Sequence, residues 1–382
     1  MRLPSIRFLI GLGTVIVVLV VGVVLYTTLG KQQDDNTPAA TPDTTLTCLG
    51  GSEKSELMGD ADVKKLLKDK YHLTINFQSL GSYDQVQLST DELNSRKVDC
   101  LWPSSASAQA VFEAQHKGGA VRAENVLQSP EVIYAGPKGT DALMAKQLVQ
   151  KRGEQYYIVD MKKLLLEYIA GKKTWESIGA VGLNGPITVS STDPARSNSG
   201  FTLAQLELNI LATDDVFSAP NLDQAKKALP KMRELYDAQG LQARSSDSGF
   251  QQWLTQGAEL KAPLYAGYEN QLIQQVVAAG ANSAQILNNV RVLYPEPTIY
   301  SDHPILALNA NASRFIDAMK DSEIQTLAWK KYGFRSATQV GLNDIAVFKD
   351  IKLADQIRTT APPAADVTLA LLDCMKDAKK CQ

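Results

Sequence analysis

The stretch Pro186 to Ala212, PITVSSTDPARSNSGFTLAQLELNILA, decides the fold class. It opens with a β-rich run, continues through a polar loop from Thr192 to Ser199, and closes as an apolar helix. In that helix, Leu203, Leu206 and Ile210 recur at the spacing of one buried face. A strand, a polar turn and an amphipathic helix in succession form the repeating unit of α/β proteins.

The same alternation of strand and helix runs through the chain on both sides of this stretch. Because such alternation favours parallel sheets, we predict an α/β fold whose sheets are covered by helices. No solenoid-like or propeller-like repeat is present. The expected strands are 45–49, 73–77, 97–102, 126–136, 186–191, 262–266, 290–294 and 305–309, and the expected helices are 62–70, 106–117, 160–170, 200–212, 222–239, 248–256, 269–279, 312–320 and 322–332.

The N-terminal region contains an uncharged apolar run at residues 8–29, FLIGLGTVIVVLVVGVVLYTTL. As a helix it would be about 33 Å long, enough to cross a hydrocarbon core of roughly 30 Å. Arg2 and Arg7 precede the run without an acidic partner, which predicts that residues 1–7 are cytoplasmic and the rest is exported. The alternative is a cleaved signal peptide, but no small-x-small cleavage site follows the run. We therefore expect a single-pass anchor in the cell membrane.

A polar linker follows at residues 30–44, and an extracytoplasmic domain fills residues 45–382. The whole chain has 39 basic and 41 acidic residues. Arg2 and Arg7 are the only charges before residue 30, so the exported part has 39 − 2 = 37 basic residues and a net charge of 37 − 41 = −4. This balance excludes the basic surface that nucleic-acid binding requires, and we expect no nucleic-acid partner.

Cysteines and histidines indicate disulfides rather than a metal site. All four cysteines follow the predicted membrane helix, in a compartment where disulfides persist. Cys374 and Cys381 share the C-terminal segment, which favours a local bond between them; four free thiols are the alternative. No C-x-x-C motif occurs and the three histidines are far apart, so we expect no zinc site.

Motifs of the common enzyme classes are missing. The sequence has no G-x-S-x-G elbow, Walker A loop, H-E-x-x-H or G-x-G-x-x-G. Asp193 and Glu269 would support glycoside hydrolysis only if they faced each other across a cleft. We expect no catalytic residue and no cofactor.

Four segments together carry a resemblance to a known family. They are GGSEKSEL at 50–57, VDCLWPSS at 98–105, SSTDPARSNSGFTLAQ at 190–205 and PLYAGYENQLI at 263–273. In this order, residues 45–350 resemble bacterial extracellular solute-binding proteins of the type 2 periplasmic-binding fold. The usual lipid-anchor cysteine of that family is replaced here by the apolar run.

The resemblance implies two hinged lobes that trap a small ligand, and an ABC-type permease as partner. Lobe one would comprise 45–133 and 300–382, and lobe two 134–299, with crossings near 133–137 and 293–301. It also implies that the first and third strands are neighbours, which would pair Cys48 with Cys100. The alternative function is a surface sensor or interaction module that uses the same fold without transport.

The ligand site should lie where strands end and helices begin, because helix N-termini and capping hydroxyls meet there. Such a site suits an oxyanion or another small polar solute, although the acidic residues in these loops leave sugars, amines and peptides open. Ser104 and Ser105 as helix caps, Trp102 as core and Glu269 as a dipole-matched cap are the structural alternatives. The candidate ligand-binding residues are Ser52, Lys54, Ser55, Ser82, Trp102, Ser104 and Ser105 in lobe one, and Thr192, Asp193, Ser197, Asn198, Ser199, Tyr268 and Glu269 in lobe two.

Overall fold

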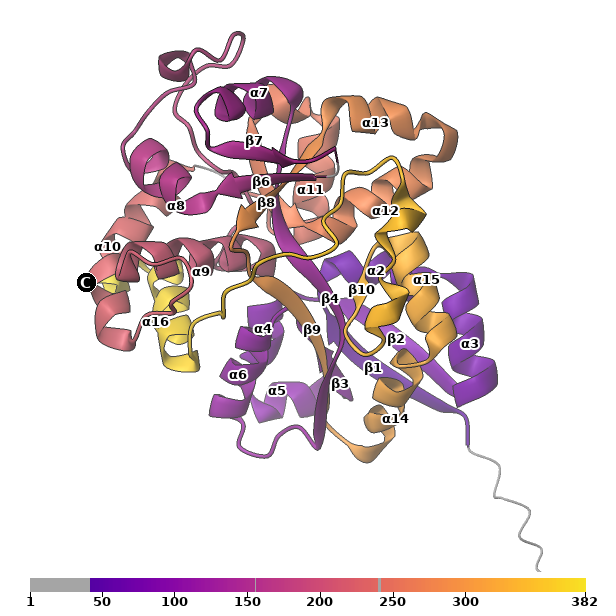
Figure 1. Cartoon of the computed structure of the whole chain (residues 1–382). Helices are drawn as coiled ribbons and strands as arrows, with labels where there is room; N and C mark the ends of the chain where they lie inside the picture. The colour runs from indigo at the N-terminus through magenta and orange to yellow at the C-terminus, as the bar shows by residue number, and fades with distance from the viewer. Residues whose placement is uncertain (1–41, 155, 240–241) are drawn as a thin grey trace, which may run out of the picture. The chain divides into compact units, whose positions relative to one another are not determined.

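The computed structural model describes residues 42–154, 156–239 and 242–382 (Figure 1). The predicted transmembrane helix at 8–29 lies outside these residues, together with the predicted cytoplasmic segment and nearly all of the linker. Among the helices of the described residues, none combines the length and the apolar composition needed to cross a membrane.

The first sheet builds lobe one and runs in the order β2-β1-β3-β9-β4, with β10 also paired to β4. β1 is parallel to β2 and β3, whereas β9 is antiparallel to β3 and β4. The expectation of parallel sheets is therefore wrong in part, because β9 brings the chain back from lobe two in the reverse direction. The strands are β1 (Thr44–Gly50), β2 (Leu73–Ser79), β3 (Cys100–Trp102), β4 (Arg122–Ala135), β9 (Tyr300–Ala307) and β10 (Arg335–Ser336).

The second sheet builds lobe two around the end of β4. There β4 pairs with β7 and β8, and β8 continues the sheet to β6 and β5. Only the β6–β8 pair is parallel among these. The strands are β5 (Val149–Arg152), β6 (Tyr156–Asp160), β7 (Leu264–Tyr268) and β8 (Arg291–Glu296).

One continuous strand connects the two lobes. Residues 122–130 of β4 pair with β9 of lobe one, and residues 131–135 pair with β7 of lobe two. Figure 1 shows β4 passing through the middle of this part of the chain, between the two groups of helices. The chain returns between Glu296, where β8 ends, and Tyr300, where β9 begins. The lobe boundaries given above stay predictions.

Helices cover both sheets. Asp60 caps α3 by accepting hydrogen bonds from the N–H groups of Asp62 and Val63, and Ser89 and Glu92 form a capping box at α5. The helices are α2 (Ser55–Gly59), α3 (Ala61–Tyr71), α4 (Ser82–Val86), α5 (Thr90–Ser95), α6 (Ala106–Gln115), α7 (Pro137–Ala145), α8 (Met161–Lys163), α9 (Asn198–Thr213), α10 (Leu222–Ala238), α11 (Ser246–Thr255), α12 (Glu269–Ala279), α13 (Ser283–Asn289), α14 (Ala310–Met319), α15 (Ser322–Tyr332) and α16 (Ala365–Lys376). Short 3-10 turns include η1 (Ser52–Lys54) and η8 (Ala378–Cys381).

The run predicted as a strand at 186–191 is not a regular strand. It carries only isolated bridges, of which Ser190 to Tyr265 is parallel. Ser190 donates to the carbonyl of Leu264 and accepts from the N–H of Ala266, so the run follows β7 for one residue and then diverges. The helix that follows it, α9, is present as predicted.

Apolar side chains fill each lobe and also connect the two. Trp102 is fully buried and packs edge-on against Phe315 at a ring distance of 5.5 Å, so it belongs to the core of lobe one. Trp175 lies in the core of lobe two. A further cluster joins the lobes, where Tyr83 of α4 contacts Phe201 of α9 with ring centroids 4.4 Å apart. The lobes therefore meet through packed apolar surface.

Both predicted disulfides are present. Cys48 on β1 lies opposite Cys100 on β3 in the parallel pairing, and the two are bonded. Cys374 near the end of α16 is bonded to Cys381 in the last turn. The prediction that the first and third strands are neighbours is confirmed.

Candidate functional site

A small polar cavity of about 30 Å³ lies between the two lobes. Its walls come from loops that follow strands of lobe one and from the segments that precede α9 and α11 in lobe two. Serine hydroxyls dominate the lining. The lining residues are Gly51, Ser52, Glu53, Ser79, Gly81, Ser82 and Ser104 from lobe one, and Ser197, Asn198, Arg244, Ser245 and Ser246 from lobe two.

Three helices of ten residues or more begin at this cavity. α6 begins at Ala106, two residues after Ser104, whereas α9 begins at Asn198 and α11 at Ser246. The first N–H groups of a helix have no partner within the helix, and its N-terminal end carries a partial positive charge. The cavity thus receives N-terminal ends from both lobes, an arrangement that favours a negatively charged or strongly polar ligand.

Five of the predicted site residues line the cavity: Ser52, Ser82, Ser104, Ser197 and Asn198. The hydroxyl of Ser82 accepts from the N–H of Ser104, and that of Ser52 accepts from the N–H of Asp247 at 3.4 Å. Each of these two hydroxyls still has its proton to donate. These protons could form hydrogen bonds to an acceptor atom of a ligand in the cavity.

Asn198 connects the lobes at the cavity. Its amide nitrogen donates to the carbonyl of Ser104 at 2.7 Å and to the hydroxyl of Tyr268 at 2.9 Å. Asn198 is 3% exposed, and its amide oxygen has no hydrogen-bond partner within the described part of the chain. Tyr268 was predicted to contact the ligand, but it lies behind Asn198 and does not line the cavity.

Lys54 and Glu53 form a buried ion pair next to Ser104 of the cavity lining. The ammonium of Lys54 is 2.5 Å from a carboxylate oxygen of Glu53 and donates to the hydroxyl of Ser104 at 2.8 Å. Burial lowers the pKa of Lys54, and the neighbouring Glu53 opposes that shift. Burial, together with the charge of Lys54, holds the pKa of His303 well below its ordinary value. Lys54 does not line the cavity, but it holds two residues that do, Glu53 and Ser104. Its contact with a ligand stays a prediction.

Three other predicted hydroxyls, those of Ser105, Thr192 and Ser199, form hydrogen bonds near the starts of helices. Ser105 caps α6 by accepting from the N–H of Ala108 at 3.1 Å. The hydroxyl of Thr192 accepts from the N–H of Gly200 at 2.9 Å and lies 2.7 Å from the hydroxyl of Ser199. These residues position the start of α9 and α6 rather than line the cavity.

Ser55 and Asp193 also do not line the cavity. Ser55 is exposed at the first position of α2. Asp193 accepts from the N–H of Ala195 and from the hydroxyl of Tyr236, which makes it a turn residue.

Glu269 belongs to a buried ion pair outside the cavity. Arg335 donates to both of its carboxylate oxygens, at 2.7 and 2.9 Å, and the hydroxyl of Tyr294 donates to one of them at 2.5 Å. Both charged side chains are at most 4% exposed. Its carboxylate is already bonded by partners from β10 and β8, and Glu269 does not line the cavity. Its contact with a ligand stays a prediction.

Sequence reasoning missed seven lining residues. The segment RSSDSG, Arg244 to Gly249, has the same signal as the segment before α9, namely serines directly ahead of an apolar helix. The missed residues are Gly51, Glu53, Ser79, Gly81, Arg244, Ser245 and Ser246.

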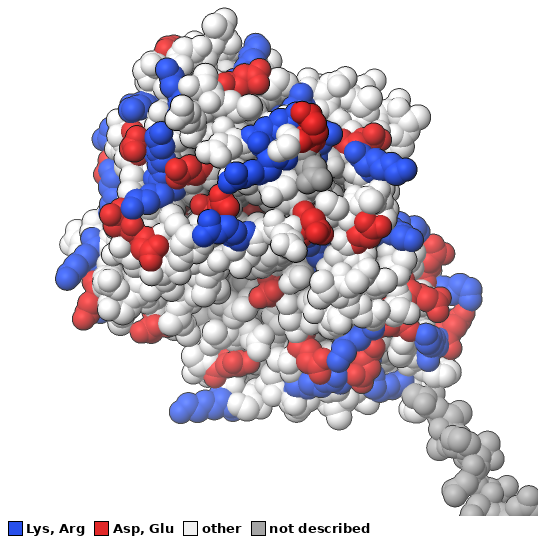
Figure 2. All heavy atoms as spheres, in the orientation of Figure 1, with Lys and Arg blue, Asp and Glu red and all other residues white. Residues whose placement is uncertain are grey.

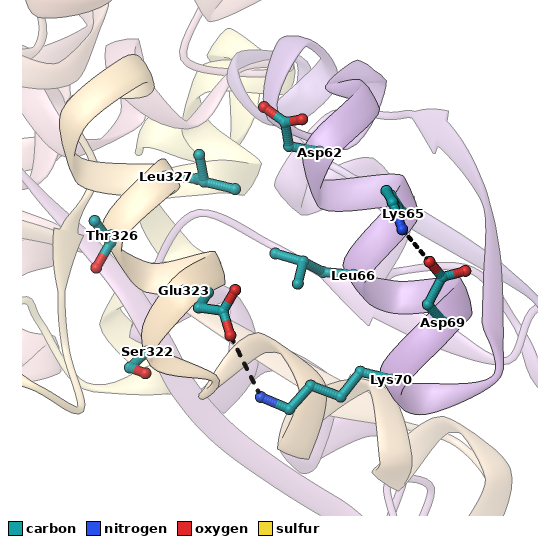
Figure 3. Close-up of a pocket in the computed structure, with 9 residues that line it drawn as sticks. All are labelled: Asp62, Lys65, Leu66, Asp69, Lys70, Ser322, Glu323, Thr326 and Leu327. Atoms are coloured by element: carbon teal, nitrogen blue, oxygen red, sulfur yellow. Dashed lines mark hydrogen bonds and ion pairs between the residues drawn. The ribbon is translucent and has the colours of Figure 1, made fainter.

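A larger cavity, of about 560 Å³, lies elsewhere, on the outer side of lobe one between α3 and α15. Figure 3 shows Leu66 and Leu327 pointing toward each other across it, with charged side chains around them. Those charges pair with one another, since Lys65 binds Asp69 and Lys70 lies 3.9 Å from Glu323. It is an open groove between two helices, without the converging polar groups of the interlobe cavity.

Charges are mixed on the surface. On the face shown in Figure 2, Lys and Arg lie among Asp and Glu rather than in patches of one sign. That face offers no extended field for a highly charged macromolecule.

A second buried group predicts pH-dependent stability. Glu207 of α9 lines a second small cavity of about 10 Å³, together with Thr192. Burial raises the pKa of the Glu207 carboxyl from an ordinary 4.5 to about 8. Between these values the folded state holds the proton that the unfolded state releases, so the free energy of unfolding falls as pH rises from 4.5 to about 8. Glu207→Gln should remove this fall and stabilise the protein at pH above 8 by on the order of 1–3 kcal/mol.

Urea unfolding of both chains at acidic and at basic pH measures this difference. Glu113→Gln, at an exposed position of α6, is the control and should show the pH dependence of the unaltered chain. Parallel pH curves for the unaltered chain and Glu207→Gln would contradict the assignment.

Comparison with known proteins rests on structure. No family model matches the sequence, and no curated protein matches it. Iron-bound HitA from Pseudomonas aeruginosa is similar with a TM-score of 0.57 and 12% identity, over 87% of this chain and 99% of that chain. The sulfate-binding protein SubI from Mycobacterium tuberculosis H37Rv is similar with a TM-score of 0.51 and 14% identity, over 85% and 96% of the two chains.

A third similar structure is the periplasmic binding protein AfuA from Actinobacillus pleuropneumoniae, with fructose-6-phosphate bound. Its TM-score is 0.54 at 14% identity, over 89% of this chain and 99% of that chain. These similarities extend over nearly the whole of each solved chain, so they include both lobes. The described part of this chain has the two-lobed type 2 fold of the periplasmic solute-binding proteins.

Proposed function

We propose that this protein is an extracytoplasmic solute-binding protein that traps a small oxyanion between its two lobes. One observation carries the proposal: the interlobe cavity is lined by serine hydroxyls and helix N-termini that come from both lobes. Neutral donors of this kind can hold an anion without a full counter-charge, since hydrogen bonds to a charged acceptor are the stronger kind.

The size of the cavity supports a solute of few atoms. A volume of about 30 Å³ holds on the order of two water molecules, each of which needs about 10–15 Å³ of such space. A tetrahedral oxyanion is in this size range. A sugar or a peptide would require a wider separation of the lobes than the structure has.

The charges around the cavity also favour a weakly charged anion. Lys54 and Arg244 are balanced by Glu53 and by the nearby Asp247, whose pKa is raised by burial and by the charges of Glu53 and Glu56. With no net positive charge from these four groups, the binding energy must come from the hydroxyl and N–H donors. A solute with several negative charges would be repelled by the two carboxylates.

Calorimetry with sulfate, phosphate, molybdate and small carboxylates, beside sugars and amino acids, tests the proposal. Ser52→Ala should weaken binding of the preferred anion by about 1.5–3 kcal/mol, the usual value of a hydrogen bond to a charged group. Ser55→Ala is a matched control from the same turn, because Ser55 is exposed and off the cavity. Saturable binding of a sugar or an amine, with no binding of any anion, would refute the oxyanion as ligand. It would leave the proposal of a solute-binding protein intact.

Membrane attachment through residues 8–29 and delivery to an ABC-type permease belong to the same proposal. The apolar run supports membrane attachment. The fold supports delivery to a permease, since the chain shares it with the substrate binding protein of an ABC transporter from Agrobacterium tumefaciens. Fractionation of expressing cells tests the first: a soluble chain that begins near residue 30 would show cleavage instead. A permease gene next to the gene of this protein would favour transport over a sensor role.

A further inference from the structure

The C-terminal segment crosses from one lobe to the other. After β10 in lobe one, the chain passes the connection between β8 and β9, where Thr298 donates to the carbonyl of Arg358 and Thr360 donates to that of Thr298. Asn209 of α9 then donates to the carbonyl of Ala361 at 3.2 Å. Figure 1 shows the yellow α16 beside α9 and α10, at a distance from β10.

α16 is attached firmly to lobe two. Arg233 of α10 donates to the carbonyls of Cys374 and Met375, at 3.2 and 3.0 Å. Leu229 and Met232 of α10 share one apolar cluster with α16. The disulfide between Cys374 and Cys381 holds η8 against the end of the helix, and η8 also packs on α10.

The same helix also packs on lobe one. α16 contacts α6, whose Val111 and Phe112 belong to the shared apolar cluster. At its end, the ammonium of Lys376 lies 2.5 Å from the amide oxygen of Gln87, just after α4. Within the described part of the chain, α16 forms no hydrogen bond to the backbone of lobe one.

Gln205 joins all three parts. Its amide nitrogen lies 2.9 Å from the hydroxyl of Ser107 on α6 and 3.3 Å from that of Thr368 on α16. Gln205 itself lies on α9, two helical turns after Asn198, which lines the cavity at the start of that helix. Any separation of α9 from α6 therefore breaks a contact that α16 shares.

We propose that α16 is a latch that holds the lobes closed, and that it stays on α10 and leaves α6 when the lobes open. The asymmetry of its contacts carries this inference. Toward lobe two it has backbone hydrogen bonds and a disulfide-held end, whereas toward lobe one it has apolar packing and an exposed side-chain pair of the kind that contributes little. The inference rests on the proposed function in one respect, namely that the lobes open to exchange solute.

Hydrogen exchange of the full-length chain, without any ligand, tests the latch. The exchange of backbone amides in α6 and in the first turn of α9 reports opening of the interface. Bridging Gln87→Cys to Lys376→Cys with a short bismaleimide should fasten the latch to lobe one and slow this exchange at least about tenfold. Ending the chain after Ala361 should accelerate it to a similar extent.

Two controls make the result decisive. Lys231→Cys bridged to Glu234→Cys within α10, where the native side chains lie 2.7 Å apart, should leave the exchange of α6 and α9 unchanged. Peptides from β1 and β2 should exchange at the same rate in all chains. Faster exchange there in the shortened chain would mean that this chain has lost its fold, and the test of the latch would then rest on the bridged chain. Equal exchange in the two bridged chains would overturn the latch. Because no ligand is used, a chain that binds no anion but responds to the bridge would refute the solute proposal only.

Discussion

Gly81→Ala is expected to weaken ligand binding at least about tenfold, the equivalent of 1.4 kcal/mol or more. A β-carbon at position 81 would lie 2.2 Å from the backbone oxygen of Arg196, which belongs to the opposite lobe. Gly81 has φ of −55°, a value that alanine adopts without strain, so lobe one should fold normally. The lobes must then stay apart at the cavity, because a backbone carbonyl cannot move aside as a flexible side chain can.

Calorimetry with the anion that the unaltered chain binds measures this loss, and thermal unfolding checks that the fold is intact. Gly59→Ala is the control, since a β-carbon there would meet nothing within 4 Å. Undiminished affinity in Gly81→Ala would show that ligand is bound with the lobes further apart than the structure has them.

Arg335→Ala is expected to lower the free energy of unfolding by about 3–5 kcal/mol, the usual result of leaving one buried charge without its partner. Arg335 donates to both oxygens of Glu269, and it also donates to the carbonyl of Ala354 at 2.6 Å. The arginine and glutamate side chains are 4% and 0% exposed, so water cannot replace the lost partner without rearrangement. The pair joins α12 of lobe two to β10 of lobe one, and its loss loosens both.

Denaturant unfolding of single and double variants separates the loss of the partner from the loss of the whole pair. Replacing both charges, with Arg335→Met and Glu269→Leu together, should cost less than Arg335→Ala alone, because no unpaired charge then remains buried. Lys65→Ala is the control: it breaks an exposed ion pair on α3 and should change the free energy of unfolding by no more than about 1 kcal/mol. A double variant less stable than Arg335→Ala would contradict this account.

The sequence by itself determined the features that depend on neighbours along the chain. The alternation of strands and helices predicted the α/β class, and the apolar stripe after Ser199 predicted α9. Polar residues at helix starts, four serines and Asn198, gave five of the residues that line the cavity, because a helix N-terminus and its capping side chain are set by adjacent residues. The pairing of Cys374 with Cys381 is local in the same sense.

Only the tertiary structure decided which of these polar residues face the cavity. Glu269 and Ser52 both stand at the start of a helical segment, yet one meets Arg335, 66 residues away, and the other meets the cavity. The reverse direction of β9, the position of Arg244 and the crossing of α16 likewise depend on contacts between distant segments. Such contacts are determined by packing and by the pairing of buried charges. The energies of both depend on all the surrounding residues, so they leave no local pattern in the sequence.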